Sequence, residues 1–87
     1  MSKAKEMFFK YGYEQVSNNE NYIEYRDYGH GDGDYSYIKF CLNMRDIEIG
    51  YYDGYGEKRF EPYYFNAIEI PMILEQSKEL GWYHDDK

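Results

Sequence analysis

The chain is poor in the residues that form disulfides, zinc sites and membrane spans. Cys41 is the single cysteine, so no internal disulfide can form, although secreted domains of this size are usually disulfide-bonded. His30 and His84, the two histidines, give no zinc-ligand spacing with one cysteine. No apolar run approaches the ~20 residues of a membrane-spanning helix. These absences favour a cytoplasmic protein with no metal and no contact with a membrane.

Motifs that would indicate an enzyme or a bound cofactor are also lacking. The segment Asp32–Asp34 begins like a calcium loop, but Tyr37 stands where that loop needs glycine. The glycines of Gly29–Gly33 lack the strand–turn–helix context of a dinucleotide-binding loop. Neither Cys41 nor any serine has a histidine partner suggested by its spacing. We therefore expect no enzymatic activity, no metal and no cofactor.

Tyrosine and acidic residues are abundant instead. Thirteen of the 87 residues are tyrosine, and 17 acidic against 10 basic residues give a net charge of -7. Tyrosine joins a large apolar ring to a hydroxyl that can stay hydrated, so it suits binding surfaces. A chain this negative repels phosphate backbones, so no direct nucleic-acid partner is expected. Because aliphatic residues are few, several tyrosines must also fill the core of the single domain expected over residues 1–87.

A helix is predicted near each end of the chain. Residues 3–11 carry one apolar stripe, with Ser2 as N-cap and Gly12 as a left-handed stop. The second helix has two possible starts, at Ala67 after a capping Asn66 or at Pro71, and the earlier start is favoured. Gly81 ends it. The stripes expected to face the core are Ala4, Met7, Phe8 and Tyr11 in the first helix, and Ala67, Ile70, Ile73, Leu74, Ser77 and Leu80 in the second.

Between the helices the apolar period changes to two, which is typical of strands. Four strands are expected over residues 13–17, 22–28, 35–42 and 47–52, with an optional edge strand over residues 60–65. Short connections between consecutive strands predict an antiparallel meander. The fold class is therefore a two-layer α+β sandwich in the order α-β-β-β-β-α. Both helices are expected on the sheet face lined by Ile23, Ile38, Phe40, Ile47 and Ile49.

The alternation leaves a second sheet face without a helix over it, called the open face below. Its expected residues are Tyr22, Glu24, Arg26, Tyr28, Tyr35, Tyr37, Lys39, Glu48 and Tyr52. One interpretation is that tyrosine merely pairs well across strands. Others are a protein-binding platform of rigid amphipathic rings or a homodimer interface. An aromatic sheet that stacks single-stranded bases would need a basic groove, which this face does not offer.

Acidic residues suggest a further role for this part of the chain. Asp46 and Glu48 have the i, i+2 spacing that places side chains ~6.6 Å apart on one side of a strand. Asp32 and Asp34 share this spacing if their loop is extended. Such an array would resemble phosphates and could enter the basic channel of a nucleic-acid-handling enzyme. The alternative is a solvated acidic surface that keeps a small protein soluble.

The two ends of the chain resemble a group of known proteins. Ala4–Phe8, Tyr11–Glu14 and Glu75–Trp82 are similar to the start and end of small, mostly uncharacterised proteins encoded by phages and prophages of Gram-positive bacteria, with Tyr22–Tyr25 the closest part of the middle. The resemblance implies no active-site residue. It implies a context, because short acidic phage proteins often inhibit host defence or nucleic-acid enzymes, CRISPR nucleases included.

These observations lead to one main hypothesis and one alternative. The main hypothesis is a non-enzymatic inhibitor that binds a host nucleic-acid-handling or defence enzyme, with acids as a nucleic-acid mimic and exposed tyrosines as anchors. The alternative is a phage structural or assembly protein that dimerises through the open face. The residues expected to contact the partner are Tyr22, Glu24, Tyr28, Asp32, Asp34, Tyr35, Tyr37, Asp46, Glu48 and Tyr52.

Overall fold

The computed structural model describes residues 2–29, 33–52 and 66–83. Its elements are α1 (Lys3–Lys10), β1 (Glu14–Asn18), β2 (Tyr22–Asp27), β3 (Tyr35–Cys41), β4 (Asp46–Tyr52), the 3-10 helix η1 (Ala67–Glu69) and α2 (Ile70–Glu79). This order confirms the predicted α-β-β-β-β-α arrangement, with each strand boundary within a residue of its prediction. The optional edge strand over residues 60–65 lies outside the described residues.

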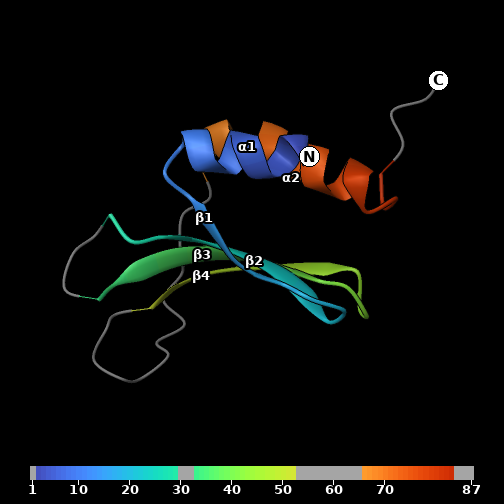
Figure 1. Ribbon diagram of the computed structural model, residues 1–87, viewed down its shortest axis with the longest axis horizontal. Coiled ribbons are helices and arrows are strands. Elements are labelled where there is room, and N and C mark those ends of the chain that lie inside the picture. Colours follow the sequence, from blue (N-terminus) through green and yellow to red (C-terminus); the bar gives the residue numbers. More distant parts are fainter. Residues whose placement is uncertain (1, 30–32, 53–65, 84–87) are drawn as a thin grey trace.

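The four strands form one antiparallel sheet in the order β1-β2-β3-β4, which is the predicted meander (Figure 1). The register aligns Ile23 with Phe40 and Phe40 with Ile47, so one row of apolar side chains crosses three strands on one face. The neighbouring row lies on the opposite face, because successive strand residues point to opposite sides. That second row consists of Glu24, Lys39 and Glu48.

The edge strand β1 contains a bulge. Gln15 is paired with Tyr25 and Ser17 with Glu24, so Val16 is an extra residue without a partner on β2. A bulge bends its strand and increases the local twist. Val16 is 37% exposed as a result of its place outside the pairing.

The capping residues of α1 are those predicted from the sequence. The Ser2 side chain accepts a hydrogen bond of 3.0 Å from the backbone N–H of Lys5. At the other end Gly12 has a φ of +93°, and the N–H of Tyr13 donates to the carbonyl of Phe8 at 2.9 Å. This return of the chain toward the last turn is typical of a glycine-terminated helix. The helix ends at Lys10, one residue before the predicted end.

Both predicted starts of the second helix are used. The Asn66 side chain accepts a hydrogen bond from the N–H of Ile68 and begins the 3-10 turn η1, and Pro71 then lies in the first turn of α2. Proline fits there because its missing N–H has no partner in a first turn. Gly81 (φ +77°) ends α2, and Trp82 donates to the carbonyl of Ser77 at 2.9 Å.

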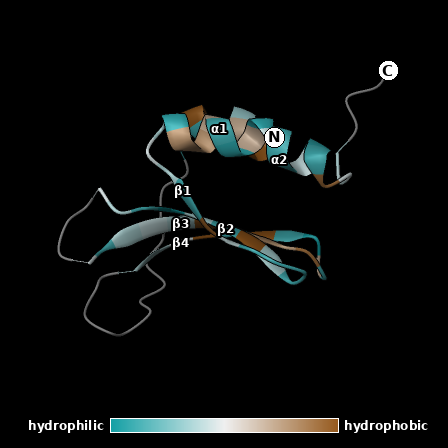
Figure 2. Cartoon of the chain, in the orientation of Figure 1, coloured by the Kyte–Doolittle hydropathy of each residue, from teal (hydrophilic) through white to brown (hydrophobic). Residues whose placement is uncertain are grey.

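The core lies between the two helices and one face of the sheet (Figure 1). The rings of Phe8 and Tyr25 stack at its centre with 3.9 Å between centroids. The strands are coloured as strongly hydrophobic only in parts, and much of β3 is pale (Figure 2), since tyrosine supplies apolar surface that a hydropathy scale ranks low. Ile47, expected under the helices, is 37% exposed beside the β3–β4 turn. The buried cluster is Phe8, Tyr13, Ile23, Tyr25, Ile38, Phe40 and Met72, which confirms that tyrosines serve as core.

The apolar stripe predicted for α2 is wrong in part. Ala67 is exposed, Ile70 and Leu74 are 44% and 39% exposed, and the residues buried in their place are Met72 and Gln76. The reason is that Tyr25 donates its hydroxyl hydrogen bond to Gln76 Oε1 at 2.5 Å. A buried phenol without an acceptor costs free energy, so α2 turns a polar side chain toward the sheet. The predicted stripe residues that do lie inward are Ile73, Ser77 and Leu80.

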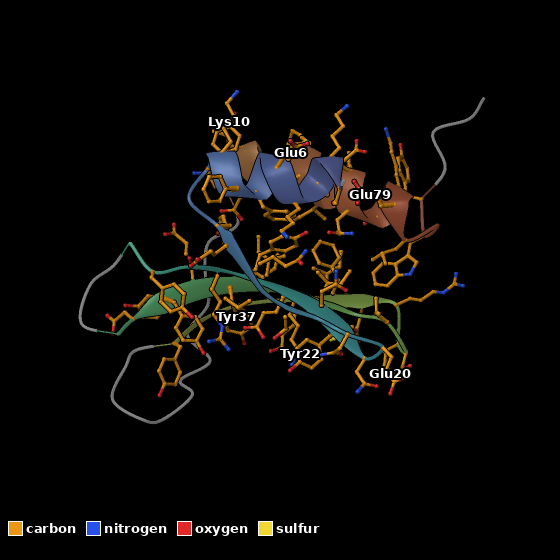
Figure 3. The ribbon with its side chains drawn as sticks, viewed as in Figure 1. Glu6, Lys10, Glu20, Tyr22, Tyr37 and Glu79 are labelled. Carbon is orange, nitrogen blue, oxygen red and sulfur yellow. The ribbon has the colours of Figure 1, made fainter. Side chains whose placement is uncertain are left out.

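The two helices are antiparallel and are joined at one end by Glu79 of α2 (Figure 3). Its carboxylate accepts hydrogen bonds from the Ser2 hydroxyl at 2.6 Å and from the Ala4 N–H at 2.8 Å. Both donors belong to the N-terminus of α1, where backbone N–H groups are otherwise unpaired and a negative charge is favourable. Within the described segments, neither helix is long and apolar enough to cross a membrane.

Replacing Glu79 with alanine should reduce the free energy of unfolding by about 1 kcal/mol, because the N-terminus of α1 loses a carboxylate cap. Urea denaturation followed by the fluorescence of Trp82, which packs against the core, measures this. Glu20→Ala is the matched control, since Glu20 is exposed in the β1–β2 turn (Figure 3) and should leave stability almost unchanged. Equal stability of both variants would contradict a stabilising role for the hydrogen bonds between Glu79 and the N-terminus of α1.

Candidate protein-binding surface

The open face lies on the side of the sheet that the helices do not cover. Figure 3 shows Tyr22 of β2 and Tyr37 of β3 on that side, as the alternation predicts. The register carries the face across to β4 by pairing Tyr35 with Tyr52 and Lys39 with Glu48. The strand pattern therefore places the expected side chains together on one surface.

A row of three tyrosines crosses the open face. Tyr35 lies in the middle, with ring centroids 5.4 Å from Tyr28 and 4.9 Å from Tyr52, and the last pair is stacked. The guanidinium of Arg26 lies 4.2 Å from the Tyr35 ring centroid, a cation–π distance. Tyr28 is 44% exposed, and the other two rings are half-buried against their neighbours. These rings are thus held in position before any partner binds.

The charges at the centre of the open face are paired within the chain. Arg26 Nε lies 2.7 Å from Glu24 Oε2, the one ion pair among residues 2–29, 33–52 and 66–83. Burial alone would lower the pKa of the Arg26 guanidinium, but its hydrogen bonds to Glu24 and Tyr28 outweigh burial and raise the pKa. Lys39 lies 4.3 Å from the ring centroid of Tyr22. Glu24 is 6% exposed and committed to Arg26, so it is a poor mimic of a phosphate.

Tyr37, which was expected to be an exposed contact residue, is buried. It is 8% exposed, and its hydroxyl donates to Glu48 Oε2 at 2.7 Å. Burial and the neighbouring Glu48 carboxylate raise the pKa of this hydroxyl. The ring lies across Gly50 of β4, where a Cβ atom would be 2.6 Å from the Tyr37 hydroxyl oxygen. Glycine at position 50 is therefore what allows the ring to lie flat on the sheet.

The predicted acidic residues do not form one array. Asp34 is half-buried and accepts a hydrogen bond of 2.5 Å from the hydroxyl of Tyr51, whose position in the register belongs to the helix-covered face. Asp46 is exposed at the start of β4, and Glu48 is half-buried on the open face. Asp32 lies outside the described residues. Of the predicted acidic contact residues, Asp46 and Glu48 are therefore the two that lie on one strand, two positions apart, on the open face.

Reactive groups within the described ranges are few. Burial, and then the neighbouring Asp46, raise the pKa of the Cys41 thiol, which disfavours the reactive thiolate. No group of three histidine, cysteine, aspartate or glutamate side chains that could hold a metal ion occurs in the part of the chain that the structure describes. On the open face the hollow between Glu24, Arg26 and Lys39 has a volume of about 40 Å³, roughly the space of a single water molecule.

Two larger hollows meet at Phe9, a residue that the sequence analysis did not select. One, of about 790 Å³, lies between α1 and β1, and the other, of about 380 Å³, lies at the C-terminal end of α1. Phe9 and Glu14 line both of them. Phe9 is 73% exposed. The available signal was that Phe9 is a large apolar residue outside the predicted apolar stripe of its helix.

Comparison with known proteins finds no family model, curated protein or solved structure that matches the chain.

Gly50→Ala should reduce the free energy of unfolding by about 1–3 kcal/mol, because the new methyl group collides with the Tyr37 ring. In a Tyr37→Val background, where no ring covers position 50, the same substitution should be neutral or slightly stabilising, since alanine suits a strand better than glycine. Urea denaturation of the four proteins in a double-mutant cycle measures the coupling. An equal cost of Gly50→Ala in both backgrounds would show that the ring does not lie there.

Proposed function

We propose that this protein is a non-enzymatic inhibitor that acts in the bacterial cytoplasm by binding a host protein through its open face. The target is a nucleic-acid-handling or defence enzyme, such as a CRISPR nuclease. The observation that supports this most is the row formed by Tyr28, Tyr35 and Tyr52, an aromatic surface already held in place by ring contacts and Arg26.

The row has the properties of an interface centre. Tyrosine is enriched in the buried parts of protein interfaces because its ring covers a large area and its hydroxyl can still bond. Side chains that are ordered before binding lose less conformational entropy when a partner docks. Tyr35 is fixed on both sides by its neighbours, and Tyr28 presents the most exposed ring of the three. The row therefore anchors the complex, and Tyr28 is its most accessible member.

The net charge of -7 selects the kind of target. A negative surface accelerates association with a basic channel, which nucleic-acid-handling enzymes possess, and is repelled by nucleic acid itself. The exposed Asp46 and the half-buried Glu48, in the first half of β4, are the described acids that could follow such a channel on the same sheet face as the tyrosine row. Glu24 contributes to the surface differently, by fixing Arg26 under the rings.

The proposal predicts that the immobilised protein captures a nucleic-acid-binding enzyme from a lysate of a Gram-positive bacterium. Added duplex DNA or RNA should release the captured enzyme, because both compete for its basic channel. The double variant Tyr28→Ser/Tyr52→Ser should lose the capture, because the row loses both outer rings. Mass spectrometry identifies the captured protein, and stepwise salt elution should release it early, since screening weakens contacts between exposed charges.

The matched control is Tyr83→Ser, which removes a tyrosine that is 41% exposed near the C-terminal end, after α2. This control should capture the same enzyme as the unchanged protein. Capture that nucleic acid does not displace, or that survives loss of both outer rings, contradicts the proposed mode of inhibition.

A second function is favoured by the paired charges of the open face. Arg26 is neutralised by Glu24, and Glu48 accepts the hydroxyl hydrogen of Tyr37, so two copies could place these faces together without burying an unpaired arginine. A phage structural or assembly protein would use the face in this way to dimerise.

Sedimentation equilibrium at micromolar concentration separates the two functions. The inhibitor proposal expects a monomer, because its tyrosine row stays available for the host protein. A stable dimer that the Tyr28→Ser/Tyr52→Ser variant dissociates would favour the assembly function and overturn the inhibitor proposal in its present form.

A further inference from the structure

A hollow of about 380 Å³ lies where α1 ends, β1 begins and β2 ends. Its lining combines three aromatic residues, Phe9, Tyr13 and Tyr28, with two acidic residues, Glu14 and Asp27. It is called the Phe9 hollow below. The turn after α1 and the end of β2 lie at the same end of the molecule (Figure 1), and a Cβ atom on Gly12 of that turn would lie 3.7 Å from the Asp27 carboxylate. The hollow does not belong to the open face, although Tyr28 takes part in both.

The aromatic lining of the Phe9 hollow presents uncovered ring surface. Phe9 is 73% exposed and Tyr28 is 44% exposed, whereas Tyr13 is 4% exposed and fixed edge-on against Phe8 with 5.8 Å between centroids. The face of an aromatic ring carries partial negative charge and attracts a cation placed within about 6 Å of its centroid.

The acidic lining forms no ion pair with any base that the structure describes. Asp27 Oδ1 accepts a hydrogen bond of 2.9 Å from the N–H of Gly29, and a Cβ atom on Gly12 would lie 3.7 Å from the same carboxylate. The carboxylate thus lies against the turn that follows α1. Among the residues that the structure describes, no lysine or arginine forms an ion pair with Asp27 or with Glu14.

A third carboxyl group, that of Glu69, lies behind Tyr13 and does not line the hollow. Glu69 is 5% exposed, its Oε1 accepts the hydroxyl of Tyr13 at 3.2 Å, and its Oε2 is buried without a hydrogen-bond partner. Burial raises the pKa of this carboxyl, and the charge of Asp27 raises it further. The negative charge of Asp27 therefore disfavours the ionised form of Glu69, and within the described ranges neither acid forms an ion pair.

The bases of the neighbouring elements do not line the Phe9 hollow, and Lys5 of α1 lines the larger adjoining hollow instead. Lys10 belongs to the last turn of α1 but extends from the side of the helix that faces away from the sheet (Figure 3). Arg26 is aligned with Glu14 in the register, yet its guanidinium is held by Glu24 and by the Tyr28 hydroxyl, to which Nη1 donates at 3.1 Å, so it forms no ion pair with Glu14 or Asp27. The C-terminus of α1 adds the partial negative charge of a helix end.

We propose that the Phe9 hollow receives an arginine side chain of the protein partner. A guanidinium can stack on an exposed ring while its N–H groups bond to a carboxylate in its plane, and arginine is more weakly hydrated than lysine. Phe9 and Tyr28 supply the rings, and Asp27 supplies the carboxylate. Because Tyr28 also belongs to the tyrosine row, one partner can cover the row and insert its arginine here. The inference rests on the proposed function for the nature of the partner, which is a basic protein.

The test uses the whole protein and a five-residue peptide with a central arginine between glycines, compared with the same peptide carrying citrulline, the neutral isostere of arginine. In a ¹⁵N NMR titration the arginine peptide should produce saturable shifts at the amides of Gly12 and Gly29, and the citrulline peptide should not. Phe9→Ala should weaken binding roughly two- to fivefold, the range of an exposed cation–π contact. Asp27→Asn, which keeps an acceptor for the Gly29 N–H, should weaken it at least as much.

Glu20→Gln is the matched control, since Glu20 is an exposed acid in the β1–β2 turn, outside the hollow, and should leave peptide binding unchanged. Equal binding of the citrulline peptide, shifts confined to residues outside the hollow, or no saturable shift up to ~10 mM overturns the proposal, because even weak ligands bind at that concentration. The titration contains no host protein, so its failure is distinct from a failure of the lysate capture. Phe9→Ala should fold normally, because alanine favours a helix and Phe9 is exposed.

Discussion

Every tyrosine that enters the core brings a hydroxyl that needs an acceptor, and this requirement decides how the helices lie on the sheet. Tyr25 reaches Gln76 and Tyr13 reaches Glu69, two residues of the C-terminal helical segment that a purely apolar core would have turned outward. Leaving a buried phenol hydroxyl without an acceptor would cost more free energy than exposing an aliphatic side chain does. Glu69 of η1 and Gln76 of α2 are therefore buried against the sheet, and apolar Ile70 and Leu74 are left at the surface.

The same residue type performs a different task on each side of the sheet. On the helix-covered side the rings of Tyr13 and Tyr25 pack with phenylalanine and donate to fixed acceptors. On the open face, which no helix covers, the rings of Tyr28 and Tyr52 pack against the ring of Tyr35, and these contacts order the surface. A small chain with few aliphatic residues thus obtains both a core and an ordered aromatic surface from tyrosine.

The local parts of this fold could be predicted from the sequence, because strand alternation and the caps at Ser2 and Gly12 depend on neighbouring residues. The orientation of α2 could not, since it depends on hydrogen bonds donated by Tyr13 and Tyr25, which lie some fifty residues earlier in the chain. Of the expected contact residues, Tyr28 and Asp46 are exposed, but Tyr37 is buried over Gly50, a contact that no spacing rule indicates. The place of Phe9 in a hollow could not be predicted either, because it depends on the tertiary contact between the turn after α1 and Asp27.

The bulge in β1 has a consequence for the behaviour of the protein in a crowded solution. Strands with a high β-propensity can pair edge to edge and extend sheets into fibres, and an uninterrupted outer strand offers a template for such growth. The extra residue at Val16 breaks the regular spacing of donors and acceptors along that rim, and exposed Glu14 adds charge beside it. A strand only five residues long with this interruption is a poor template, so the bulge protects this edge of the sheet from pairing with a strand of another molecule.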